Sequence, residues 1–258
     1  MCLLIFAHQT STRYPLVIAA NRDEFHARPT TASQFWTDHP VLLAGKDLDQ
    51  GGTWMGVTRD GRFAAITNYR DPSRTAVAPR SRGELPLDYL AGQCDPQAYL
   101  QGVAAQATEY AGFNLLLGDR DHLWYFTNSL PQAERAPLCL QPGIYGLSNA
   151  RLDTLWPKVA IGKTRMKNLL DKEPPTHDAL ASVVSDQRLA DLHTLRPHGM
   201  ETGMDQLLSA QFIVTGLYGT RSSTTLWTDS TGLASWRELS FNELGEIREV
   251  REFEFALI

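Results

Sequence analysis

The sequence predicts one domain of the mixed α+β class, spanning residues 1–258, with antiparallel sheets. Apolar runs of strand length come first, helical segments follow, and strand-like runs return at the end of the chain. Because helices do not alternate regularly with strands, this order disfavours a parallel doubly wound sheet. No internal repeat, low-complexity segment or Pro-, Gly- or Ser-rich linker divides the chain.

Strand signals dominate the first third of the chain. Two apolar runs, LLIFAH and YPLVIAA, predict a pair of strands, the second of which stops at the polar residues 21–24. The polar stretch 26–50 predicts a long surface or site-covering loop. Residues 51–71 then predict two strands around Gly61, a turn position where glycine can take a positive φ.

Helices and further strands are predicted over the rest of the chain. A helix is expected to begin after Asp95, the residue type of an N-cap, with Pro96 at its first position. Residues 188–206 are polar, and residues 196–205 within them predict a loop. The remaining predicted elements are helices at 84–92, 152–171 and 176–186, a hairpin at 113–128, and strands at 143–149, 210–229, 233–239 and 249–258.

Composition favours a soluble cytoplasmic protein. The net charge of -5 and the pI near 5.8 argue against a nucleic-acid partner. Three widely spaced cysteines fit neither a disulfide framework nor a zinc site, and they suit a reducing compartment. The apolar start is too short for a signal peptide, and no stretch is long enough to cross a membrane. The oligomeric state stays open, and a homo-oligomer is compatible with the sequence.

The sequence lacks the motifs of several common kinds of site. GGTWMG has no following Lys-Ser/Thr and opens no helix, so it predicts tight turns rather than a phosphate loop. The seven histidines are scattered without metal-ligand spacing, and no GxSxG motif indicates a serine hydrolase. We therefore expect no metal.

Polar residues gather at the expected ends of strands. The cluster 21–24, NRDE, is either a solvated turn or a set of rigidly held functional groups, in which Arg22 could hold an anion and Asp23 an amine. Arg221, in YGTR, is either an exposed hairpin arginine or a site residue. Asn68, in TNYR, and Asn149, in GLSN, either cap their own backbone or donate to an oxyanion.

Cys2 has two interpretations. It is either a small hydrophobic residue at the start of a buried strand or, after removal of Met1, an N-terminal nucleophile. A free α-amine has a pKa near 8 and can accept the thiol proton, so nucleophile and base come from one residue. Such a site also needs a carboxylate, a cation and amide donors, and the strand-end residues offer a candidate for each.

The ordered motifs MCL, ANRDE, GGTWMG, TNYRD, SRGEL, GFNLLLGD, YGLSN and YGTRSST resemble those of the NRDE family, also called the transport and Golgi organization 2 family. They run from residue 1 to about 225. The family resembles the N-terminal nucleophile hydrolases of the penicillin V acylase and bile salt hydrolase branch. This resemblance implies a four-layer αββα sandwich with two antiparallel sheets.

The resemblance also implies roles for individual residues. Cys2 would be the nucleophile, with Arg22 beside its sulfur and Asp23 holding the α-amine. Asn68 and Asn149 match the oxyanion-hole positions, and Arg221 matches the arginine that completes the site. In the acylase branch the arginine and the aspartate are not adjacent, so the division of roles within the pair at 22 and 23 stays open.

Two functions follow. The first is an amidohydrolase that cuts a linear C–N bond in a small molecule through an acyl-Cys2 intermediate and needs no cofactor. The second is a carrier of haem or lipid that keeps the hydrolase fold as a scaffold, suggested by the family association and by Phe35, Trp36, Trp54 and Tyr69. We also assign Asn21, Trp54 and Tyr69 to substrate binding.

Overall fold

The computed structural model describes residues 2–70, 77–172 and 174–258. Its contacts divide the chain into two compact units, each assembled from separate stretches. Unit 1 comprises Met1–Ala27, Pro142–Ser148 and Leu152–Glu254, and unit 2 comprises Arg28–Gln141, Asn149–Arg151 and Phe255–Ile258. This division into two units does not test the prediction of a single domain.

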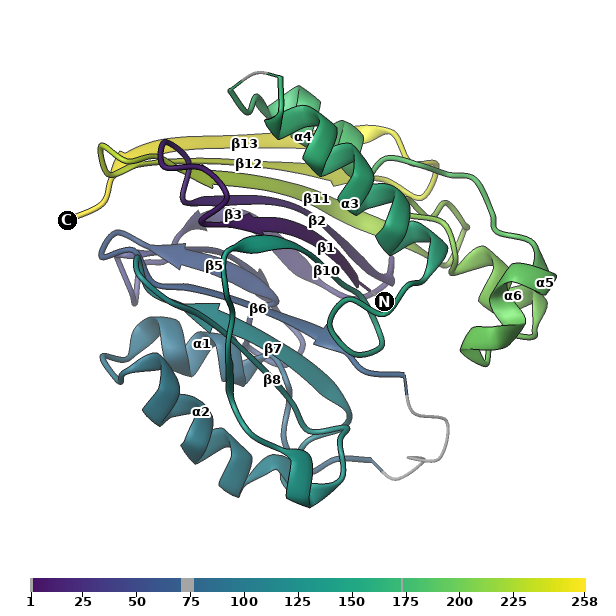
Figure 1. The fold of residues 1–258 in the computed structure, drawn as a ribbon, viewed down its shortest axis with the longest axis horizontal. Coiled ribbons are helices and arrows are strands. Elements are labelled where there is room, and N and C mark those ends of the chain that lie inside the picture. The colour runs from purple at the N-terminus through teal and green to yellow at the C-terminus, as the bar shows by residue number, and fades with distance from the viewer. Residues whose placement is uncertain (1, 71–76, 173) are drawn as a thin grey trace. The chain divides into compact units, whose positions relative to one another are not determined.

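Unit 1 is built on a six-stranded sheet in the order β10-β1-β2-β11-β12-β13 (Figure 1). The pairings from β10 to β12 are antiparallel. Its strands are β1 (Cys2–His8), β2 (Leu16–Phe25), β10 (Gly143–Leu147), β11 (Tyr218–Thr228), β12 (Leu233–Phe241) and β13 (Ile247–Ala256). Their apolar runs bury residues on both faces of the central strands, as in Leu3 to Ala7 of β1.

Two helices pack on one face of this sheet. Helix α3 (Pro157–Leu170) contacts β1 and β10, and α4 (His177–Val183) contacts β2 and β11. Pro157 begins α3, so the helix expected over 152–171 starts later than predicted, and the side chain of Thr176 caps α4 by accepting from the backbone N–H of Ala179. The remaining helical pieces of unit 1 are α5 (Leu192–Leu195), the 3₁₀ helix η3 (Arg196–His198) and α6 (Gly203–Leu207).

Unit 2 contains a seven-stranded antiparallel sheet in the order β3-β4-β5-β6-β7-β8-β9. Each strand is hydrogen-bonded to its neighbour in sequence. The strands are β3 (Thr30–Phe35), β4 (Leu42–Asp47), β5 (Met55–Thr58), β6 (Phe63–Asn68), β7 (Phe113–Gly118), β8 (Leu123–Thr127) and β9 (Leu138–Cys139). Gly61 joins β5 to β6 at a φ of +84°, which confirms the predicted turn glycine.

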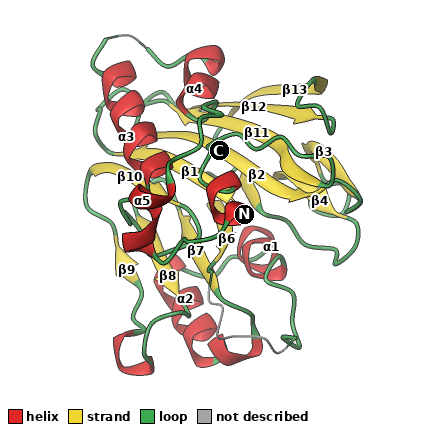
Figure 2. Ribbon diagram, turned by 90° about the vertical axis from the view of Figure 1, so that its right-hand side faces the viewer, coloured by secondary structure: helices red, strands yellow, loops and turns green. Residues whose placement is uncertain are grey.

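Helices α1 (Glu84–Ala91) and α2 (Pro96–Ala105) lie beside β5 to β8 (Figure 2). Asp95 caps α2 by accepting from the backbone N–H of Ala98, and Pro96 occupies the first position, as predicted. A buried cluster, which includes Tyr89, Leu100 and Phe113, fills the space between these helices and the sheet. Two 3₁₀ turns, η1 (Ala107–Glu109) and η2 (Gln132–Glu134), complete the unit.

The predicted fold class is confirmed, because the chain is α+β with two antiparallel sheets that each carry helices. Three local predictions are wrong. The expected loop 26–50 contains β3 and β4. The expected loop 196–205 contains η3 and the start of α6, which is capped by the box that Thr202 and Asp205 form. The expected strand at 210–229 begins only at Tyr218.

Two parts of the predicted motifs, Met1 and Asp71, lie outside the described residues. Within the described part of the chain, none of the helices combines the length and the apolar character needed to cross a membrane.

Candidate functional site

The first predicted site residues meet where β1, β2 and β11 pair in the sheet of unit 1. Cys2 lies opposite Arg22, and Arg22 lies opposite Ser222. Directly opposed residues of antiparallel strands share a face, so these three side chains lie on one side of the sheet. Because side chains alternate along a strand, Asn21 and Asp23 lie on the opposite side, where α3 and α4 pack.

The polar cluster 21–24 does not end its strand, contrary to the sequence prediction. Strand β2 continues to Phe25, and Asn21, Arg22 and Asp23 are all buried inside it. A strand can hold polar residues in its interior only where the neighbouring elements supply partners. The solvated-turn interpretation of NRDE is therefore wrong, because the central position of β2 surrounds these groups with protein.

Arg221 is the extra residue of a β-bulge in β11. The register passes from Thr220 opposite Asp23 directly to Ser222 opposite Arg22, which leaves Arg221 without an opposing residue. Its guanidinium donates to the carbonyl of Phe25 at 2.9 Å. Bulges redirect side chains and are frequent next to active sites. The exposed hairpin turn that was the alternative for YGTR is not formed, since these residues lie within β11.

Asp23 is held on the helix-covered face. The hydroxyl of Thr220 donates to its carboxylate at 2.7 Å, and the phenol of Tyr218 donates to its backbone carbonyl at 3.0 Å. Burial raises the pKa of this carboxyl, while the positive charges of Lys158 and Arg22 and the bond from Thr220 oppose the rise.

Cys2 sits at the start of β1 with its carbonyl accepting a hydrogen bond from Ser148 at 2.8 Å. Burial raises the pKa of its thiol, and the negative charge of Asp23 adds to the rise. The backbone N–H of Asp23 and the charge of Arg22 act in the opposite direction. A thiol in this environment stays protonated until a base removes its proton.

Ser222 was not identified from the sequence. Its side chain is 4% exposed and shares the face of Cys2 and Arg22, yet its hydroxyl has no hydrogen-bond partner within the described residues. A buried polar group of this kind is rare in native proteins and marks a place where another molecule can complete the bonding.

Lys158, in the first turn of α3, was also missed. It is only 1% exposed, and its ammonium donates to the carbonyl of Leu208 at 3.0 Å. The sequence contained a signal for it, because Lys158 precedes the buried residues Gly162 and Met166 by one and two helical turns. It therefore shares their core-facing side of the helix, where a lysine is unusual.

Asn21, predicted to bind substrate, has its amide engaged inside unit 1. It donates to the carbonyls of Val184 and Gln211, both at 2.8 Å, and accepts from the hydroxyl of Ser223 at 2.6 Å. These bonds tie β2 to β11 and to the segments that follow α4. They give Asn21 a structural function, and its role in substrate binding stays a prediction.

The other predicted residues, Asn68, Asn149, Tyr69 and Trp54, belong to unit 2. The amide of Asn149 donates to the carbonyl of Asn68 at 2.7 Å, which links the two predicted oxyanion residues. The side chain of Asn68 is exposed, whereas Asn149 is buried. Their proposed action on a Cys2 substrate stays a prediction.

The aromatic residues that suggested a carrier pack within unit 2. Trp36 belongs to the buried core cluster and donates through its indole to the carbonyl of Ala44. Phe35 meets Phe255 edge to face, with the guanidinium of Arg59 over its ring. The ring of Trp54 occupies the space that a β-carbon on residue 45 would need, a position held by glycine.

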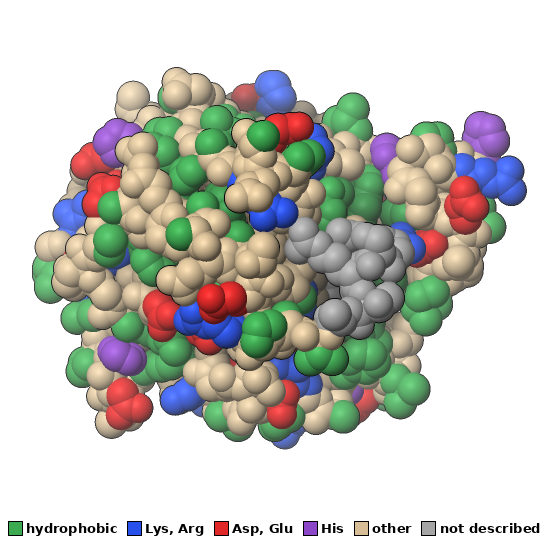
Figure 3. Space-filling view, turned by 90° about the horizontal axis from the view of Figure 1, so that it is seen from below, with side chains coloured by type: hydrophobic (Ala, Val, Ile, Leu, Met, Phe, Trp, Pro, Cys, Tyr) green, Lys and Arg blue, Asp and Glu red, His purple; other side chains and the backbone are tan. Residues whose placement is uncertain are grey.

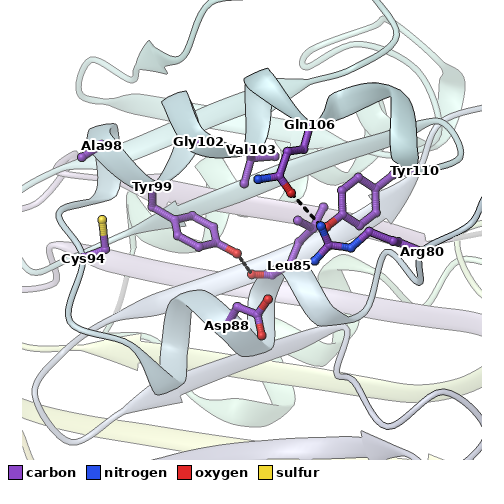
Figure 4. Close-up of a pocket in the computed structure, with 10 residues that line it drawn as sticks. All are labelled: Arg80, Leu85, Asp88, Cys94, Ala98, Tyr99, Gly102, Val103, Gln106 and Tyr110. Carbon is purple, nitrogen blue, oxygen red and sulfur yellow. Dashed lines mark hydrogen bonds between the residues drawn. The ribbon is translucent and has the colours of Figure 1, made fainter.

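A pocket of about 320 Å³ lies on unit 2 between α1 and α2 (Figure 4). None of the predicted site residues lines it. Its polar groups bond to one another, as in the contact of Arg80 with Gln106 at 2.7 Å and of Tyr99 with the carbonyl of Leu85 at 2.7 Å. Over residues 2–70, 77–172 and 174–258, three or more His, Cys, Asp or Glu side chains nowhere gather with the spacing of a metal site.

The sequence matches the model of the family described as transport and Golgi organisation 2 over residues 1–243. The chain belongs to this family. The Bos taurus transport and Golgi organization protein 2 homolog is 34% identical over 260 aligned positions, which cover 93% of each chain. The Homo sapiens homolog is 33% identical over 279 positions, covering 100% of this chain and 99% of the human protein.

Solved structures similar to this transport and Golgi organization 2 family member include two hydrolases. The C2A mutant of the conjugated bile acid hydrolase from Clostridium perfringens is 11% identical, with 99% and 97% of the two chains covered and a TM-score of 0.44. The Caenorhabditis elegans ortholog of N-acylethanolamine-hydrolyzing acid amidase is 8% identical, with 71% and 86% covered and a TM-score of 0.40. Likenesses at this level support no conclusion about the reaction of this family member.

The distribution of charged side chains on the surface of this family member is consistent with its moderate net charge of -5. On the face shown in Figure 3, Lys and Arg side chains are interspersed with Asp and Glu side chains rather than gathered by sign.

Proposed function

We propose that this protein is an amidohydrolase in which Cys2, exposed as the N-terminal residue by loss of Met1, attacks the carbonyl carbon of a linear amide. The single observation that carries the proposal is the register of β1, β2 and β11. It sets Cys2 opposite Arg22 and next to Asp23, at the bulge formed by Arg221. A nucleophile, a carboxylate and two cations thus come from three adjacent strands.

The chemistry follows from these groups. The α-amine of Cys2 takes the thiol proton, and the sulfur bonds to the carbonyl carbon of the amide. Collapse of the tetrahedral intermediate breaks the C–N bond, and the amine leaves with the proton from the α-amine. Water then attacks the acyl-cysteine and releases a carboxylic acid and the free thiol.

The surroundings of Cys2 suit this sequence of steps. Burial keeps the thiol protonated in the resting protein, so an adjacent base is needed to activate it. Arg22 provides a positive charge on the same face of the sheet as Cys2. The hydroxyl of Ser222 has no hydrogen-bond partner among the described residues, so it can bond to the acyl group of a substrate.

The test compares the wild-type protein with Cys2→Ala on a panel of N-acyl amides of increasing acyl-chain length. We expect the variant to fold but to lose turnover by at least about 10³-fold, because the nucleophile is removed. The intact mass of the wild-type protein should lack Met1 and should gain one acyl group after treatment with a thiol-directed acylating probe.

Cys94→Ala is the matched control, because it removes an exposed thiol of unit 2 and should leave both readouts unchanged. Retention of Met1, or undiminished amide hydrolysis by Cys2→Ala, would contradict the proposal. The haem or lipid carrier is not the function we favour, since Phe35 and Trp36, which suggested it, are engaged in packing within unit 2.

A further inference from the structure

We propose that β13 is a dimer interface, at which two copies of this chain pair residues 247–253 antiparallel about a two-fold axis at Val250. The strand forms one edge of the six-stranded sheet of unit 1, with β12 on its inner side (Figure 1). Within the described residues, no strand lies on its outer side. The inference is independent of the proposed reaction, because none of these residues belongs to the Cys2 site.

The outer edge of β13 can accept a further strand. Such an edge carries unpaired backbone N–H and C=O groups, and native proteins usually keep it short, twist it away or cover it. Strand β13 is ten residues long, and the side chains of Ile247 and Val250 are 59% and 49% exposed. A long edge with exposed apolar side chains is a place where a strand of another chain can add to the sheet.

The order of residues in β13 favours a second copy of the same strand as the partner. The strand begins IREVREF, in which an Arg-Glu pair stands on each side of Val250. In an antiparallel pair about Val250, Arg248 lies opposite Glu252 of the second copy, and Glu249 lies opposite Arg251. Each contact occurs twice because the axis is two-fold, so the directly opposed charges within residues 247–253 all have opposite sign.

Other registers bring like charges together. Alternate residues of an edge strand direct their N–H and C=O groups outward, and only these residues can bond to each other across the interface. The axis must therefore pass through a residue rather than between two. An axis at Glu249 or Arg251 would set two like charges opposite each other, and the same holds at Arg248 or Glu252. Among these central positions, Val250 alone avoids this repulsion.

The charged side chains that this pairing uses are accessible. Arg248 is exposed, and the side chain of Glu252 is 60% exposed. Glu249 and Arg251 contact each other along the strand at 2.6 Å, with 40% and 48% of their side chains exposed. Two such pairs brought together across the axis form a group of alternating charges. Charges on an edge strand usually prevent pairing, but the order of these charges matches a second copy.

The main experiment measures the mass of the full chain by sedimentation equilibrium at protein concentrations from about 1 μM to about 1 mM, which cover weak and moderate interfaces. We expect the mass to rise from one to two times the 28.8 kDa of a single chain. Because the paired charges are exposed to salt, added NaCl should raise the dissociation constant. A mass of one chain throughout this range, or a mass that grows past two chains, would overturn the proposal.

Charge reversals test the register. Arg248→Glu sets glutamates opposite each other in the dimer, and Glu252→Arg sets arginines opposite each other, so each variant should raise the dissociation constant at least about tenfold. The double variant Arg248→Glu, Glu252→Arg restores opposite charges and should recover most of the affinity. A mixture of the two single variants should dimerise better than either variant alone, because each chain then carries the charges that the other requires.

Arg196→Glu is the matched control, because it makes the same change of charge at an exposed residue of η3. Its dissociation constant should match that of the wild type. Equal weakening by Arg196→Glu and Arg248→Glu would reflect net charge alone, and a dimer that Arg248→Glu leaves intact would have its interface elsewhere. Either result would overturn the proposal.

A crosslink locates the axis. The background is Cys2→Ala, Cys94→Ala and Cys139→Ala, which removes the native thiols. A cysteine introduced by Val250→Cys meets its own copy on the axis, where opposed Cβ atoms lie about 4.5–5.5 Å apart, so oxidation with copper phenanthroline should join two chains in a disulfide. Ile247→Cys is the control, since it lies about 20 Å from its own copy and should stay unlinked. Equal crosslinking of the two variants would contradict this register.

Discussion

Asn21 shows how a polar side chain is accommodated in the centre of a sheet. Its amide makes three hydrogen bonds, to Val184, Gln211 and Ser223, and it is only 2% exposed. The sequence could identify the NRDE cluster as unusual. It could not reveal that Asn21 forms hydrogen bonds with residues that are 163 or more positions away in the sequence.

At this residue we predict a large loss of stability. Asn21→Ala leaves two buried carbonyls and one buried hydroxyl without their partner, so the free energy of unfolding should fall by about 2–4 kcal/mol. Urea denaturation followed by circular dichroism measures it. Asn68→Ala, at an exposed side chain, should change stability by less than about 0.5 kcal/mol. Equal stability of Asn21→Ala and the wild type would contradict the structural role.

For Cys2, Arg22 and Asp23 the sequence indicated a function, but not how the side chains are arranged. Their residue types and their place in the sequence were sufficient to propose an N-terminal nucleophile. Their spatial relation depends on the register of three strands, in which a slip of one residue would move each side chain to the other face.

At the scale of the elements, α3 approaches β1 through a glycine. A β-carbon on Gly162 would lie 2.6 Å from Ile5, whose side chain is fully buried. This close approach brings α3, which carries the buried Lys158, against β1. The helical pattern of residues 157–170 predicted the helix, but the depth of its packing depends on a residue from a strand 157 positions earlier.

We expect substitution by alanine to change the stability of the protein in opposite directions at two glycines in helix interiors. Gly162→Ala should lower the free energy of unfolding by about 1–3 kcal/mol because it overfills the contact with Ile5. At Gly102, in α2, the added carbon would meet no atom within 4 Å beyond the adjoining backbone of its own helix, so Gly102→Ala should raise stability by about 0.5–1 kcal/mol. Thermal or urea unfolding of both variants measures the difference. A stabilising Gly162→Ala would mean that α3 does not lie this close to β1.

On the scale of the whole molecule, the chain passes repeatedly between its two compact units. Unit 2 includes the last four residues, Phe255–Ile258, the first two of which end strand β13. It also includes residues 149–151, which lie between two stretches of unit 1. Neither unit is therefore a continuous piece of chain. The single domain expected from the sequence stays a prediction, which the cooperativity of unfolding can test.

We predict that both units unfold in a single transition. Hydrogen exchange in urea, measured on peptides from β2 and from β7, should report the same free energy of opening near the unfolding midpoint. Gly162→Ala, which perturbs unit 1, should lower the opening energy of the β7 peptide by the same amount as that of the β2 peptide. Two separate transitions, or an effect confined to β2, would show that the units are independent domains.

The sequence by itself determined the α+β class, most helices and strands, and the residue types of an N-terminal nucleophile site. These depend on local periodicity, on caps such as Asp95 and on turn glycines, which act over a few residues. It could not determine that β2 runs through NRDE, because β11, which pairs with these residues, is distant in the sequence. It also missed β3 and β4, because the segment 26–50 is mostly polar and does not show a clear strand pattern.

Only the tertiary structure decided how the polar groups around β2 are placed. The strand register placed Ser222 beside Arg22, the bulge left Arg221 unopposed, and the packing of α3 buried Lys158. Each of these depends on long-range pairing and burial, where the desolvation of a charged group is offset by partners that no local pattern contains.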